Sequence, residues 1–196
     1  MKKNSEKLVV GITGASGSIY SIRLVEALLE AGYHVHVICT HNGKKVMKYE
    51  TGIDVDEWAA DLTDKPGIIV QEDNEDLFSA LASGSHKFHA MVVIPCSMGT
   101  LAEISGGLAK NLLCRAADVA MKENRKLILV PRETPLNAIH LENMLKLSRL
   151  GVTILPAMPG FYHKPLTIEE LVDFVVGKVL DTLGIDNELF EKWGSK

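Results

Sequence analysis

A run of small residues at positions 11–17 could bring the protein backbone close to a ligand. The run reads Gly-Ile-Thr-Gly-Ala-Ser-Gly and joins a predicted strand to a predicted helix, whose free N–H groups favour an anion. Its glycine spacing departs from the dinucleotide fingerprint, and the second predicted strand ends in Cys39-Thr40-His41, without a carboxylate for a ribose. These features favour a mononucleotide or a different ligand over NAD. A glycine-rich turn that serves only tight strand–helix packing is the alternative.

A second strand-to-helix junction, residues 95–100, reads Pro-Cys-Ser-Met-Gly-Thr. Ser97 and Thr100 supply hydroxyl groups at the N-terminus of the helix, where a phosphate or a polar ring edge would bind. Taken alone, this pattern is that of an ordinary N-cap. Because the carboxyl ends of parallel strands share one edge of a sheet, the two junctions together favour a shared ligand.

Cationic residues follow on the next predicted elements. Arg115 and Lys122 are seven residues apart, which places them on one face of a helix, where such side chains are usually solvated. Arg132 and Glu133 come directly after a predicted buried strand. Because charges there are costly to bury without a purpose, we interpret them as an anion clamp with an acid/base neighbour.

Metal binding and cysteine chemistry have weaker support in the sequence than an anion-binding site. His34 and His36 share a predicted strand face and His86 and His89 are three apart, but neither pair has a third ligand at a recognisable spacing. The acidic run at 72–76 resembles a solvated loop and helix start rather than a magnesium site. Cys96 has no evident histidine partner, so we expect it to pack in the core. No metal site is predicted.

Short β-branched runs alternate with helical patterns, which predicts a doubly wound, mostly parallel α/β sheet in a three-layer αβα, Rossmann-like arrangement. Residues 41–66 are ambiguous, with a helix expected over 44–50 and loop elsewhere. In the helix at 139–150, the core candidates are Leu141, Met144, Leu145 and Leu147. The predicted strands cover 8–12, 34–39, 68–70, 88–94, 127–130 and 152–155, and further helices cover 19–31, 112–123 and 168–183, with another from 98 onward.

Length and composition limit the classes of protein. The 196 residues predict one domain, 1–196, with a C-terminal tail at 185–196. A net charge of −4 gives no basis for non-specific binding to nucleic acid or to anionic membranes. Three scattered cysteines exclude a disulfide framework, and no apolar stretch approaches the roughly 20 residues of a membrane span. The polar start, residues 1–6, has no apolar signal segment, so we expect a cytoplasmic protein.

Five segments, in order along nearly the whole chain, resemble the UbiX-type flavin prenyltransferases. The Arg-Glu-Thr-Pro-Leu and Pro-x-Phe-Tyr elements are the specific part of this resemblance, whereas the first glycine loop alone would be weak evidence. The segments are residues 11–17, 95–101 (Pro-Cys-Ser-Met-Gly-Thr-Leu), 115–119 (Arg-Ala-Ala-Asp-Val), 132–136 (Arg-Glu-Thr-Pro-Leu) and 158–165 (Met-Pro-Gly-Phe-Tyr-His-Lys-Pro).

The resemblance implies a flavoprotein fold and a metal-independent enzyme that joins the dimethylallyl group of dimethylallyl monophosphate to N5 and C6 of reduced FMN. The product, prenylated FMN, would serve a UbiD-type decarboxylase of ubiquinone or phenolic-acid metabolism. The implied FMN ligands are Gly14, Ala15, Ser16, Thr40, Ser97, Met98, Gly99, Thr100 and Arg132. The residues implied around the prenyl phosphate are Arg115, Lys122, Tyr162 and Lys178, with Glu50 and Glu133 nearby.

Three side chains have implied catalytic roles. Ser16 would orient or polarise the flavin N5, while Glu133 would accept the proton lost from C6, with Glu50 as the other candidate. Trp193 joins the substrate-binding set as an aromatic that could close the site, although it is also a candidate anchor for the tail. The family often has serine where this chain has Thr40, which keeps the hydroxyl. The sequence has no Asp-Asp-x-x-Asp motif for magnesium, which suits a monophosphate held by Arg and Lys.

Two other functions share this pattern of residues. A flavin-dependent cysteine decarboxylase would carry Pro-Ala-Met-Asn, whereas residues 156–159 read Pro-Ala-Met-Pro, which argues against that activity. A flavin-carrying subunit of an aromatic-acid decarboxylase complex remains open at this point. The family also forms trimers packed into dodecamers, so we expect a closed homo-oligomer in which neighbouring chains complete each site.

Overall fold

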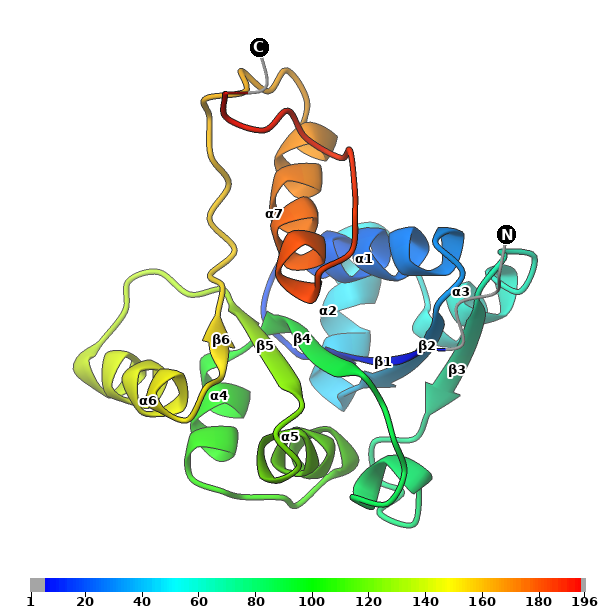
Figure 1. Cartoon of the computed structure of the whole chain (residues 1–196), viewed down its shortest axis with the longest axis vertical. Helices are drawn as coiled ribbons and strands as arrows, with labels where there is room; N and C mark the ends of the chain where they lie inside the picture. The colour runs from blue at the N-terminus through cyan, green and yellow to red at the C-terminus, as the bar shows by residue number, and fades with distance from the viewer. Residues whose placement is uncertain (1–5, 195–196) are drawn as a thin grey trace.

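The computed structural model describes residues 6–194. The polar start at residues 1–5 and the last two residues of the tail lie outside the described residues. Six parallel strands form one sheet in the order β3-β2-β1-β4-β5-β6 (Figure 1). The strands are β1 Lys7–Ile12, β2 His34–Cys39, β3 Ile68–Glu72, β4 Ala90–Cys96, β5 Lys126–Pro131 and β6 Thr153–Ile154.

Helices cover both faces of this sheet, as the alternating sequence pattern predicted. One core packs α1, α2, α3 and α7 against strand residues such as Val10 and Val92, and the other packs α4 and α5 against their neighbours Val9 and Met91. This alternation follows the two-residue period of a strand. The helices are α1 Ser18–Glu30, α2 His41–Thr51, α3 Val55–Asp61, α4 Met98–Ser105, α5 Leu112–Lys122, α6 Ala138–Arg149 and α7 Ile168–Leu183, with a short 3-10 turn, η1, at Ala80–Ala82.

The prediction of loop beyond residue 50 was wrong at α3. Asp54 caps this helix by accepting a hydrogen bond from the Asp56 N–H at 3.1 Å, and Val55 and Trp58 bury one face against the core. Seven residues give too short a run for helical periodicity to stand out from a loop. The helix depends on tertiary burial of that face for its stability.

The predicted core face of α6 was also partly wrong. Leu147 is fully buried, but the side chains of Leu141 and Leu145 are 52% and 51% exposed. The adjoining strand β6 has only two residues, so the sheet is too short at this edge to cover the whole apolar face of α6. The helix packs mainly on α4 and leaves much of that face on the surface.

The strand order places a topological switch between β1 and β4. From β1 the chain proceeds outward through β2 and β3, then returns to β4 on the other side of β1 and continues to β6. The loops after β1 and β4 therefore lead to helices on opposite faces and leave a crevice at the carboxyl edge of the sheet. Beyond β6, the chain leaves the sheet as an arm that rises to the start of α7 (Figure 1). The prediction that residues 1–196 form a single domain with a tail at 185–196 stays a prediction.

Candidate functional site

The switch point holds a cavity of about 420 Å³ between helix N-termini. Thr40 caps α2, since its Oγ1 accepts from the Gly43 N–H at 3.0 Å, and Ser97 caps α4 by accepting from the Thr100 N–H at 3.2 Å. Both hydroxyl residues were predicted site residues, and the fold brings them together. The cavity is lined by Gly14, Thr40, His41, Asn42, Asn74, Glu75, Ser97, Thr100, Glu103 and Asn111.

The helix N-termini of α1 and α5 at this edge are already satisfied by the protein. At α1, Glu50 accepts from the Gly17 and Ser18 N–H groups at 3.0 and 2.9 Å. At α5, the Leu112 and Leu113 N–H groups donate to the backbone and side-chain oxygens of Asn74. A third donor of α5, the Cys114 N–H, bonds Asn111 Oδ1 at 2.9 Å.

The N-termini of α2 and α4 differ from the other two. First-turn N–H groups have no acceptor within their own helix. Within residues 6–194, the backbone N–H groups of His41, Asn42, Met98 and Gly99 donate no hydrogen bond to the protein. Together with the hydroxyls of Thr40 and Thr100, these groups make an anion site of the kind that holds a phosphate. The residues therefore fit the phosphorylated end of a mononucleotide.

Glu50 of α2 and Arg132, which follows β5, both contact the Ser16 loop between β1 and α1. Arg132 Nε donates to the Ser16 carbonyl oxygen at 3.3 Å. Burial raises the pKa of Glu50, but hydrogen bonds from the Ser16 side chain and from the Ser18 and Gly17 N–H groups outweigh it, so the pKa lies below its ordinary value. Glu50 is therefore a carboxylate at neutral pH and anchors the loop.

Glu133 lies next to this cluster but is open to solvent. Its Oε1 accepts from the Thr134 N–H at 2.9 Å, and both Arg132 and Glu133 are exposed. The expectation that Arg132 and Glu133 carry a burial cost was therefore wrong. The exposed positions leave both side chains free of a burial cost and accessible to a ligand at the sheet edge.

Arg115 and Lys122 do not join the cluster within one chain. Arg115 bonds the Ala82 carbonyl oxygen at 3.0 Å and Asp118 at 2.5 Å. Lys122 is at the last turn of α5 and pairs with Glu123. A helix that begins at the carboxyl edge of a parallel sheet runs toward the opposite edge, and seven residues span about 10 Å of its length.

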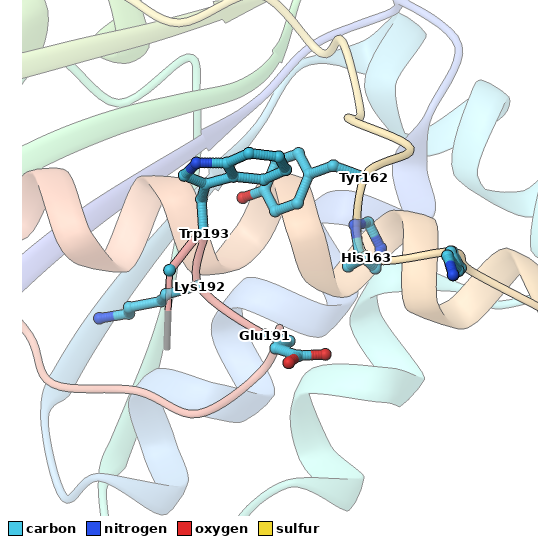
Figure 2. A pocket seen from close by; sticks show the side chains of 7 residues that line it. Tyr162, His163, Glu191, Lys192 and Trp193 are labelled. Atoms are coloured by element: carbon cyan, nitrogen blue, oxygen red, sulfur yellow. The ribbon is translucent and has the colours of Figure 1, made fainter. Parts of the chain in front are cut away.

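Tyr162 and Trp193 meet on the arm and tail, away from the sheet (Figures 1 and 2). Their rings lie edge to face with centroids 5.4 Å apart, and Tyr162 also contacts Phe174 of α7 at 5.7 Å. Trp193 contacts the arm through this ring pair and is 82% exposed, and its role as a tail anchor stays a prediction. These residues border a cavity of about 300 Å³, and Lys178 of α7, 4.0 Å from Asp181, does not line it. Within residues 6–194 of one chain, neither Tyr162 nor Trp193 contacts the Ser16 loop.

Several residues of the cavity were missed by sequence reasoning. Asn74 lies within the run interpreted as a solvated acidic loop, but it is 8% exposed and accepts hydrogen bonds from the first-turn N–H groups of α5. Asn111 carried a usable signal, because an asparagine directly before an apolar helical run is a typical N-cap. Asn42 had none: it lies close to Gly14, where an added Cβ would come within 2.7 Å of the Asn42 Cβ.

Cys39, Cys96 and Cys114 are all buried free thiols. Cys96 is buried as expected, and burial raises its pKa above the ordinary range. Burial likewise raises the pKa of Cys39 to about 12. Within residues 6–194, no three His, Cys, Asp or Glu side chains come close enough to hold a metal ion. In the same part of the chain, no helix has the length and apolar character needed to cross a membrane.

Comparison with known proteins agrees with this geometry. The Flavoprotein family model matches residues 1–180. The flavin prenyltransferase UbiX of Halalkalibacterium halodurans is 52% identical over 191 residues, covering 95% of this chain and 93% of the relative. The solved structure of AnUbiX (PadA1) in complex with FMN and dimethylallyl pyrophosphate is 38% identical, with a TM-score of 0.92 over 98% of this chain and all of that one.

Other solved structures have either high sequence identity to this chain or only its fold. A dodecameric FMN-dependent UbiX-like decarboxylase from Escherichia coli O157:H7 is 43% identical, with a TM-score of 0.90 over 96% of this chain and all of that one. The FMN-dependent cysteine decarboxylase TvaF is 17% identical with a TM-score of 0.55, covering 76% of this chain and 88% of that one, and shares the fold alone. Because the family model matches residues 1–180 and a curated relative is 52% identical over 95% of the chain, this chain belongs to the Flavoprotein family and, within it, to the UbiX flavin prenyltransferases.

Proposed function

We propose that this protein is a flavin prenyltransferase that transfers the dimethylallyl group of a prenyl phosphate to reduced FMN. The observation that carries the proposal is the pair of open helix N-termini, α2 and α4, beside the cluster of Ser16, Glu50 and Arg132. Such an edge can hold a phosphorylated flavin at one end and reacting atoms at the other. Relatives of this length and similarity carry that activity in their names.

The residues that would hold FMN fall into two groups. The first-turn N–H groups of α2 and α4, with the hydroxyls of Thr40, Ser97 and Thr100, would bind its phosphate. The loop Gly14–Ser16 and Arg132 would lie along the flavin ring, because small residues allow close approach of the backbone. Reduced FMN supplies the nucleophilic N5 and C6 of the reaction.

The protein's contribution to bond cleavage is electrostatic. When the allylic C–O bond breaks, the electron pair leaves with the phosphate, and cations that bind the growing charge lower the barrier. Arg115, Lys122, Lys178 and Tyr162 are the proposed ligands of that phosphate. The absence of an Asp-Asp-x-x-Asp motif favours a monophosphate donor whose charge is met by these side chains.

The second bond, at flavin C6, requires loss of a proton. We propose Glu133 as the acceptor, with the departing phosphate as a relay. Glu50 is less suited to accept it, because its carboxylate already receives the Gly17 and Ser18 N–H groups and its pKa is lowered. Ser16, bonded to Glu50 through its side chain, is the proposed partner of flavin N5.

A second copy of the chain is proposed to complete each site. The arm and tail expose large apolar side chains, including Phe161 at 69%, Leu166 at 90% and Trp193 at 82%. An exposed apolar surface of this kind favours protein–protein contact. Assembly into a dodecamer would bring Tyr162 and Lys178 of one chain to the Gly14–Ser16 loop of another, and would shield the reaction from water.

The product is proposed to pass to a UbiD-type decarboxylase in the cytoplasm. Prenylated FMN is a cofactor, so a second enzyme would have to bind it before it could act. A pull-down from lysate with the flavin-loaded protein, compared with the flavin-free protein, would test whether transfer requires contact.

The direct test of the activity is anaerobic reconstitution of the purified protein with reduced FMN and dimethylallyl monophosphate. Mass spectrometry of the extracted flavin should show the gain of one dimethylallyl-derived unit, with release of inorganic phosphate. A flavin-carrying subunit without catalytic activity would bind FMN but release no phosphate. The same assay with dimethylallyl pyrophosphate distinguishes the two donors.

A further inference from the structure

Thr13 is a buried polar residue that the proposed reaction does not use. Its side chain is 1% exposed, so it cannot touch a ligand in the cavity. It follows β1 directly and precedes Gly14, the first residue of the loop proposed to meet the flavin. Buried hydroxyl groups are retained where they satisfy specific partners, because an unpaired one is costly.

The Thr13 hydroxyl joins the two strand ends at the switch point. It donates to the Pro95 carbonyl oxygen at 2.8 Å and accepts from the Ser97 N–H at 2.8 Å. The Thr13 N–H also donates to the Pro95 oxygen at 3.3 Å. One side chain thereby fixes the loop after β1 against the residue that caps α4.

The bond to Ser97 sets the orientation of the α4 N-terminus. With its N–H held by Thr13, Ser97 directs its Oγ to the Thr100 N–H at 3.2 Å, while its carbonyl oxygen accepts from the Leu101 N–H at 2.9 Å. This arrangement leaves the Met98 and Gly99 N–H groups for an anion. Without an acceptor for its N–H, Ser97 would be free to rotate and the cap would loosen.

We propose that Thr13 is a positioning residue for flavin binding, acting through Ser97 and Gly14. The inference rests on the proposed function, since it concerns how the same site is held ready for FMN. Thr13 aligns the two ligand-binding loops before FMN arrives, so the ligand does not bear the cost of ordering them.

The test compares three variants by titration of FMN fluorescence, with melting temperature measured alongside. Thr13→Val keeps the shape but removes both hydrogen bonds, and Thr13→Ser restores them. Ser105→Ala is the matched control: it removes the buried hydroxyl, 5% exposed and bonded to Asn143 at 3.0 Å, at the opposite end of α4. All three variants should lose thermal stability.

Only Thr13→Val should weaken FMN binding, by about tenfold or more, while Thr13→Ser and Ser105→Ala stay within about twofold of the wild type. If Thr13→Val does not fold, Thr13→Ser is compared with Thr13→Cys instead. The cysteine side chain is similar in size to serine, but its sulfur is a weak hydrogen-bond donor and acceptor. Wild-type affinity in Thr13→Val, or equal weakening in Thr13→Ser or Ser105→Ala, would overturn the positioning role. Failure of the wild type itself to bind FMN would instead overturn the proposed function, and this inference with it.

Discussion

Glu50→Gln isolates the contribution of one carboxylate to the loop at 16–18. In the native protein, Glu50 accepts from the Gly17 N–H at 3.0 Å and the Ser18 N–H at 2.9 Å. A glutamine oxygen keeps a neutral acceptor but loses the charge. Hydrogen bonds to a charged group contribute about 1.5–3 kcal/mol, against about 0.5–1.5 kcal/mol for a neutral pair.

The position of Glu50 limits the size of this effect. It lies at the N-terminus of α1, where a negative charge adds about 0.3–1 kcal/mol through the helix dipole. Because Glu50 is exposed, solvent screens both terms, and the lower end of each range applies. We therefore expect Glu50→Gln to lower the free energy of unfolding by about 1–2 kcal/mol at pH 7. For a chain of this length, the melting temperature should fall by about 2–8 °C.

The effect has a defined pH dependence. Since folding lowers the pKa of Glu50 below its ordinary value of 4.5, the stabilisation is present above pH 4.5 and is lost as the pH falls through the native pKa. The wild type and Glu50→Gln should therefore differ at neutral pH and converge in acid. Urea unfolding monitored by circular dichroism across this range measures the difference directly.

Glu142→Gln, in the exposed part of α6, is the matched control and should leave stability unchanged. An equal stability of Glu50→Gln and the wild type at pH 7 would refute the anchoring role of the carboxylate. A difference that persists unchanged below the native pKa would show that the side-chain charge is not its source.

Three further outcomes test the proposed chemistry. Glu133→Gln should keep FMN bound but lower the rate of product formation by about 10²–10⁴ in the reconstitution assay, and a rate within threefold of wild type would place the base elsewhere. Prenyl transfer from dimethylallyl monophosphate should survive EDTA, whereas complete loss restored by magnesium would contradict a phosphate held by Arg and Lys alone. Mixing inactive Ser16→Ala and Tyr162→Phe proteins, then reassembling them, should restore part of the activity if sites are shared, and a fully active monomer by light scattering would exclude sharing.

The fold class and the sheet edge proposed for the site are both predictable from the amino-acid sequence. Alternating β-branched and amphipathic runs indicate parallel βαβ units, and small or hydroxyl residues follow the first, second and fourth strands. Because parallel strands end at one edge, Thr40 and Ser97 could be placed near each other from their positions alone. Such patterns depend only on residues that are close in the chain, so they can be recognised without knowledge of the tertiary structure.

Which helix N-termini keep unbonded N–H groups depends on tertiary contacts. Glu50 lies 33 residues from Gly17 and Asn74 lies 39 from Leu113, and nothing local in either segment signals these pairings. After folding, the first-turn N–H groups of α1 and α5 are bonded by Glu50 and Asn74, while those of α2 and α4 stay available for a ligand.

The separation of the proposed phosphate ligands was likewise a tertiary result. Helical spacing placed Arg115 and Lys122 on one face, but the direction of α5 carries Lys122 away from the site edge. The arm after β6 similarly holds Tyr162 and Trp193 off the sheet. Periodicity identifies the face of an element, whereas the element's direction and partners are set by packing between residues distant in the chain. That packing assigns the Ser16 loop and the aromatic arm to different parts of one protomer.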